Sequence, residues 1–187
     1  MLGSGHVAGF ETFGITRINA FIDYNIGMNS ETLHLVIRFS DTMFDVGDVI
    51  SNHNEVVKKH KAVWFGKLGG TLSFSRIELL NKQILEKKPT FVYLVKGNRK
   101  KSTPYKAQIL TVTRDFPKKE QDLIPSYYAE KKLLKYMSVW IKVGHIEKVE
   151  MNDLKNFKTI NSIFPLEETL SRSSSGYFLI HESKLIY

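Results

Sequence analysis

Aromatic and basic side chains beside a glycine loop are the residues of this sequence best suited to chemistry. Trp64 ends a short apolar run and is followed by Phe65, Gly66 and Lys67. A tryptophan at the point where a strand gives way to a glycine loop offers a rigid, flat face on which a base can stack. The alternative is a strand end that packs a core tryptophan.

Two tyrosines could supply a second flat wall. Tyr127 and Tyr128 lie in the irregular stretch 114–135, which contains two prolines, and long loops of this kind are often binding elements. Their alternative role is to cap the core beneath the loop. Trp140 has alternating polar and apolar neighbours, which favours a core position. A base taken out of its strand needs flat walls, hydrogen bonds to its edge and cations for its phosphates.

Positive charge is concentrated in one quarter of the chain. Residues 58–106 carry 13 Lys and Arg and 2 Asp and Glu, whereas residues 1–57 have a net charge of −5 and residues 107–187 of +2. This concentration favours a polyanionic partner, because phosphate neutralisation supplies most of the sequence-independent affinity for nucleic acid. A solvated lysine face is the alternative. The segment includes a very basic hairpin connection with Arg99, Lys100 and Lys101.

Other classes of chemistry find little support. The six histidines show no compact ligand spacing and the chain has no cysteine, so we expect no metal site. The glycines after Trp64 lack the spacing of a Walker loop or a dinucleotide fingerprint, so we expect no nucleotide cofactor. The acidic pairs fall on solvated helix faces; they are Glu78 with Glu86 and Glu167 with Glu168. We therefore expect a binding protein rather than an enzyme.

Size and hydropathy indicate one soluble domain with an appendage. The chain has 187 residues, which suits a single domain. No apolar run approaches the roughly 18 residues of a membrane span, and the N-terminus lacks the layout of a secretion signal. The absence of cysteine favours a reducing, cytoplasmic setting. We expect residues 1–30 to be an appendage of unknown role and residues 31–187 to form the domain.

Strand and helix signals together predict the fold class. Apolar alternation and β-branched residues predict strands at 33–39, 61–67, 90–96, 105–113, 136–143 and 177–181. Helices are expected at 51–60, from a capping box at Ser75 to Pro89, and from Pro165 to Leu170, with a turn at 158–162. Short connections between these elements predict an α+β domain, a curved mixed sheet or open β-barrel flanked by short helices.

The order of the short motifs resembles the EVE and YTH branch of the PUA-like superfamily over roughly residues 33–182. The motifs are Val63-Trp64, Val92-Tyr93-Leu94-Val95, Tyr105-Lys106-Ala107, Val139-Trp140-Ile141-Lys142-Val143 and Lys158-Thr159-Ile160-Asn161-Ser162 before Glu167-Glu168. The resemblance implies a curved barrel with an aromatic pocket for a modified base, commonly N6-methyladenine or a modified cytosine. Two features depart from the YTH pattern: Phe65 replaces a small polar residue, and the loop has tyrosines in place of tryptophan.

The resemblance completes the set of candidate site residues. Base binding is assigned to Trp64, Tyr127, Tyr128, Asn161 and Ser162, and phosphate binding to Lys67, Arg99, Lys100, Lys101, Lys158 and Arg172. Similar domains are the DNA specificity modules of McrB-type restriction ATPases. We therefore expect a reader that flips a modified DNA base into its pocket, with an ATPase or nuclease as partner or fusion and no membrane association. An RNA-binding reader, an enzyme acting on nucleic acid and a protein-interaction scaffold are the alternatives.

Overall fold

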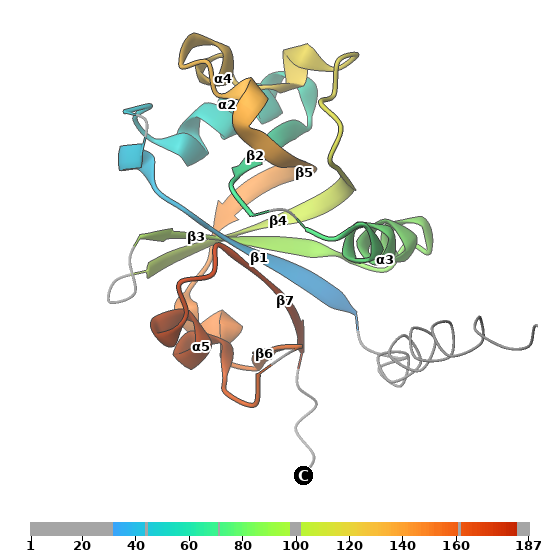
Figure 1. Ribbon diagram of the computed structural model, residues 1–187, viewed down its shortest axis with the longest axis vertical. Helices are drawn as coiled ribbons and strands as arrows, with labels where there is room; N and C mark the ends of the chain where they lie inside the picture. Colours follow the sequence, from blue (N-terminus) through green and yellow to red (C-terminus); the bar gives the residue numbers. More distant parts are fainter. Residues whose placement is uncertain (1–31, 44, 71, 98–101, 161, 183–187) are drawn as a thin grey trace, which may run out of the picture. The chain divides into compact units, whose positions relative to one another are not determined.

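The computed structural model describes residues 32–43, 45–70, 72–97, 102–160 and 162–182 (Figure 1). Their strands form one sheet with the order β2-β5-β4-β3-β1-β7-β6. The strands are β1 (Leu33–Phe39), β2 (Val63–Leu68), β3 (Phe91–Gly97), β4 (Ser102–Thr113), β5 (Met137–Lys148), β6 (Phe157–Thr159) and β7 (Tyr177–Glu182). Strands β1 and β3 are parallel and the other pairs antiparallel. The expected α+β class with a mixed sheet is confirmed. The expected appendage lies outside the described residues.

Short helices flank the sheet. They are α2 (Val49–His60), α3 (Phe74–Leu85), α4 (Tyr127–Glu130) and α5 (Leu166–Arg172). Helix α2 begins after Asp48, whose carboxylate accepts a hydrogen bond from the Ser51 amide at 2.9 Å. The residue that caps the start of helix α3 is Ser73, whose hydroxyl accepts from the Arg76 amide. The helix therefore begins two residues earlier than a cap at Ser75 would place it. In Figure 1, α2 and α4 lie beside β2 and β5, whereas α5 lies beside β6.

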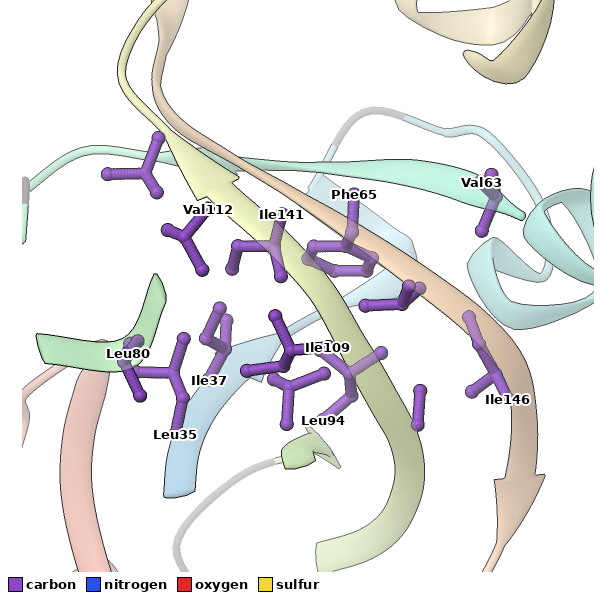
Figure 2. Close-up of a cluster of buried hydrophobic side chains, with 14 of the residues drawn as sticks. Leu35, Ile37, Val63, Phe65, Leu80, Leu94, Ile109, Val112, Ile141 and Ile146 are labelled. Atoms are coloured by element: carbon purple, nitrogen blue, oxygen red, sulfur yellow. The ribbon is translucent and has the colours of Figure 1, made fainter. Parts of the chain in front are cut away.

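The main hydrophobic cluster gathers side chains from β2, which ends the sheet order, and from strands as far along that order as β1 and β7. Leu35 and Ile37 of β1 point into the same cluster as Val63 and Phe65 of β2 (Figure 2). Helices α2 and α3 cover this cluster with residues that include Leu80. The sheet is therefore strongly curved, yet β2 is hydrogen-bonded only to β5 within the described residues. The sheet does not close into a barrel.

Two smaller clusters lie outside this core. Val36, between Leu35 and Ile37, points to the other face of β1 and packs with Leu166 and Leu170 of α5. The third cluster contains Trp64, Trp140, Tyr127, Tyr128, Leu123 and Leu133. It joins the outer face of β2 and β5 to the stretch 114–135, where α4 and two 3-10 turns, Gln121–Leu123 and Leu134–Tyr136, replace a regular loop.

Candidate nucleic-acid interface

A cavity of about 350 Å³ lies between β1 and the edge strand β2 of the curved sheet. Its lining includes Phe39, Phe65, Lys67, Tyr127, Leu133 and Gly176. These residues come from β1, β2, the stretch around α4 and the approach to β7. The cavity is mainly apolar, and the ammonium of Lys67 lies beside the lining residue Gly176. Its volume falls within the range of about 300–1,000 Å³ that is usual for ligand sites.

Phe65 of β2 and Phe39 of β1 are in contact at this cavity, although these two strands are not hydrogen-bonded to each other. Their ring centroids are 6.1 Å apart with an interplanar angle of 80°, an edge-to-face contact. Phe65 is buried and also packs on the ring of His53 at 4.9 Å, whereas Phe39 is half-buried. The two phenylalanines therefore form a rigid aromatic wall, of which Phe39 is the more accessible part.

Tyr128, which also lines the cavity, is held by a buried hydrogen-bond network. Its hydroxyl accepts from the Gly66 amide at 2.9 Å and lies 3.5 Å from Nε2 of His53. His53 Nδ1 lies 2.7 Å from the Val49 carbonyl, which can only accept, so Nδ1 carries the proton and Nε2 is the acceptor. Burial lowers the pKa of His53 to about 4 and raises that of the Tyr128 hydroxyl to about 12. Both groups are neutral at pH 7.

Tyr127 stacks on Tyr128 and lines the cavity as well. The two ring centroids are 4.3 Å apart with an interplanar angle of 23°. Burial is also the main reason that the pKa of Tyr127 is raised. Gly66 permits the close approach of strand β5, because an added Cβ would lie 2.8 Å from Met137 Cγ and 3.0 Å from Trp140. The glycine beside Trp64 is therefore needed for packing rather than for a flexible loop.

One comparison with known proteins decides the family. A family model described as Pua-like matches residues 35–185, which is most of the chain and includes β2 to β7 and all of β1 except its first two residues. The chain belongs to the Pua-like family. Comparisons with curated proteins and with solved structures gave no match. Membership of the Pua-like family indicates nucleic-acid binding, and it confirms the superfamily that the sequence motifs resemble.

The Pua-like domain places Trp64 away from the cavity. Because side chains alternate along a strand, Trp64 points to the face of β2 opposite to Phe65 and Lys67. It is 4% exposed, and its Nε1 donates to Glu120 Oε2 at 2.8 Å. Glu120 Oε1 in turn accepts from Lys142 Nζ at 2.7 Å, and the Lys142 hydrogen bond is the main reason that the pKa of Glu120 is lowered. Trp64 thus holds the stretch 114–135 on the sheet.

The remaining candidate residues of the Pua-like domain are spread over several places. Tyr127, Tyr128 and Lys67 line the cavity. Ser162 lines a second cavity. Lys158 lies in β6, which pairs with β7 and takes up the first two residues of the expected turn at 158–162; the chain turns after Thr159, whose carbonyl accepts from the Ser162 amide at 3.2 Å. Asn161, Arg99, Lys100 and Lys101 lie outside the described residues. Arg172 forms an ion pair with Glu168 at 2.5 Å and has its guanidinium carbon 4.6 Å from the Phe164 ring centroid.

Sequence reasoning missed Phe39 and Phe65, which line the cavity beside the residues it selected. Arg38 is also a lining residue, but its guanidinium points to the other face of β1. The alternation along 63–68 contained a signal, because it puts Phe65 and Lys67 on one face and Trp64 on the other. Arg38 donates to the Leu170 carbonyl and lies 5.8 Å from the Phe178 ring centroid. Lys67 Nζ donates to the carbonyls of Leu68 and Gly70 at 3.1 and 2.7 Å, and burial lowers its pKa.

Two further properties of the described residues bear on function. They contain no group of three His, Asp or Glu placed to hold a metal ion. None of the helices in the described ranges is long and apolar enough to span a membrane.

Proposed function

We propose that this Pua-like domain is a non-catalytic reader of a modified base in DNA, and that the cavity between β1 and β2 holds the base after it has left the duplex. The observation that carries the proposal is the cavity itself. It combines about 350 Å³ of space with aromatic walls of Phe39, Phe65 and Tyr127 and with the ammonium of Lys67.

The chemistry of a flipped base matches these groups. A base outside its stack loses stacking energy, which flat side chains can restore by about 1–3 kcal/mol per base. The exocyclic methyl group of N6-methyladenine or of a modified cytosine adds apolar surface, which the rings of Phe39 and Phe65 would remove from water. Lys67 Nζ gives two of its three N–H groups to the Leu68 and Gly70 carbonyls, so that one N–H would remain to read the base edge.

The charge of the chain supports a polyanionic partner on the same side. Lys67 lies in the cavity wall. Lys132 and Lys135 are exposed on either side of a short segment whose Leu133 also lines the cavity. These cations would meet the phosphates that flank a flipped base. The resemblance of the motifs to specificity modules leads us to assign the domain to a modification-dependent restriction system, with an ATPase or nuclease as its partner.

Binding to matched oligonucleotides tests the proposal. Fluorescence anisotropy would compare duplexes that differ in one N6-methyladenine or one modified cytosine, at about 50 and 200 mM salt. We expect at least one modified duplex to bind about tenfold more tightly than its unmodified counterpart. Equal affinity for all duplexes would rule out modified-base recognition. Displacement of the DNA by a smaller amount of RNA of the same sequence and modification would instead identify an RNA reader.

A further inference from the structure

A second cavity adjoins the first through the segment that leads into β7. It has a volume of about 310 Å³. Ser175 and Tyr177 line this second cavity, whereas Gly176 between them lines the first. Its other polar lining consists of Arg76 from α3, Thr159 from β6, and Ser162 and Thr169 around the start of α5. Five residues with hydroxyl groups and one arginine therefore line a single hollow.

Local hydrogen bonds hold the hydroxyl groups of Ser162 and Thr169 in place. Ser162 Oγ accepts from the Phe164 amide at 3.1 Å and from the Thr169 hydroxyl at 3.2 Å. A serine hydroxyl that accepts two hydrogen bonds still has its own O–H to donate. The pair therefore offers a positioned donor to an oxyanion.

Positive charge reaches the boundary between the two cavities from both sides. Arg76 Nη1 donates to the Tyr177 hydroxyl at 3.2 Å, and its guanidinium carbon is 5.9 Å from the ring centroid. Lys67 Nζ, in the wall of the first cavity, is 5.2 Å from the centroid of the same ring. One tyrosine thus positions a cation at each cavity. Among the residues that line the second cavity, none has a carboxylate that would oppose an anion.

We propose that the second cavity binds the sugar and phosphate of the nucleotide next to the flipped base. A guanidinium group with hydroxyl donors is suited to a phosphate, because it presents several N–H groups in a planar arrangement. The apolar remainder of the lining, from Ile160, Phe178 and Leu179, suits the carbon face of a sugar. The strand would cross the Ser175–Tyr177 segment, with its base on one side and its neighbouring phosphate on the other.

This inference rests on the proposed function, and a set of ligands separates the two. The modified nucleoside alone probes only the first cavity, whereas the modified duplex engages both. Arg76→Gln should weaken duplex binding about tenfold, because it removes a charge-assisted contact. It should also reduce the slope of log affinity against log salt by about 0.9. Its affinity for the nucleoside should equal that of the wild type.

Lys82→Gln is the matched control, because it removes one positive charge from the same helix at a side chain that is 72% exposed. Ser162→Ala is a second test that leaves the Arg76–Tyr177 contact in place, and it should weaken duplex but not nucleoside binding. If Arg76→Gln and Ser162→Ala both bind the duplex as Lys82→Gln does, the second site is refuted while the first stands. A wild-type domain that binds neither nucleoside nor duplex would refute the proposed function itself. A free nucleoside monophosphate that binds as tightly as the duplex would overturn the assignment to a strand.

Discussion

Neighbouring residues on opposite faces of β2 provide the sharpest test of where the base stacks. Phe65 lines the cavity, whereas Trp64 lies in the cluster beneath the stretch 114–135. We expect Phe65→Leu to weaken binding of the modified duplex and Trp64→Phe to leave that affinity unchanged. Both substitutions keep an apolar side chain, so that each variant should still fold.

The expected magnitudes differ between affinity and stability. Loss of an aromatic stacking face costs about 1–3 kcal/mol per base, so Phe65→Leu should raise the Kd by about tenfold or more. Trp64→Phe removes the Nε1 hydrogen bond to the Glu120 carboxylate at 2.8 Å. Hydrogen bonds to charged groups contribute about 1.5–3 kcal/mol, and the smaller ring leaves a void. The free energy of unfolding of Trp64→Phe should therefore fall by about 2–4 kcal/mol.

Two measurements on the same samples complete this test. Urea unfolding gives the stability of each variant, and anisotropy titration with the modified duplex gives its affinity under conditions where the protein is folded. The expected pattern is a large stability loss for Trp64→Phe and a large affinity loss for Phe65→Leu. If Trp64→Phe loses tenfold in affinity while Phe65→Leu binds as the wild type does, the base stacks on Trp64 and our choice of cavity is wrong.

Three further predictions concern the stability of the fold. Burial lowers the pKa values of His34 and His53 to about 4. In the unfolded chain both histidines become protonated from about pH 6.5 downwards, whereas in the folded domain they stay neutral until about pH 4. The free energy of unfolding in urea should therefore be lower at pH 4.5 than at pH 7 by about 2–3 kcal/mol per histidine. Equal free energies at the two pH values would contradict this prediction. Gly66→Ala should lower stability by about 1–3 kcal/mol, whereas Gly144→Ala, where an added Cβ meets nothing within 4 Å, should cost much less in the same thermal unfolding assay. Glu120→Gln should cost about 1–2 kcal/mol, because its partners Trp64 and Lys142 are largely buried; unchanged urea unfolding would show that this contact does not hold the loop.

The sequence predicted the strands well, because their signals are local. Alternating apolar residues in 33–39 and 177–181 indicate β1 and β7 almost to the residue. Strand β6 has only three residues, Phe157–Thr159, too few for a period to be visible, and its pairing with β7 is a tertiary contact. The start of α3 was misplaced because Ser73 and Ser75 are both good caps, and the first helical residue, Phe74, is 68% exposed and carries no core signal.

The site was only partly predictable, because both faces of β2 are apolar. Alternation separates Trp64 from Phe65, but it does not say which face the stretch 114–135 covers. That stretch is anchored by Trp64 and Glu120, 56 positions apart in the sequence, and no local pattern reports such a contact. Tyr127 and Tyr128 were selected for their place in an irregular stretch, and the structure puts both at the cavity. Their alternative role in capping a cluster is also present, since they pack on Trp140 and its neighbours.

The open edge of the sheet explains why a cavity exists at this point. Strand β2 is hydrogen-bonded only to β5, and β1 already has β3 and β7 as its neighbours, so within the described residues no ladder with a strand spacing of about 4.8 Å joins β1 to β2. Here the two strands meet only through side chains, with Phe39 and Phe65 centred 6.1 Å apart. Contacts between side chains can hold the curvature of the sheet and still leave room between the strands. Filling that room should therefore close the site without unfolding the sheet. Ser40→Phe, at the cavity wall beside Phe39, should abolish nucleoside binding while thermal unfolding stays close to that of the wild type.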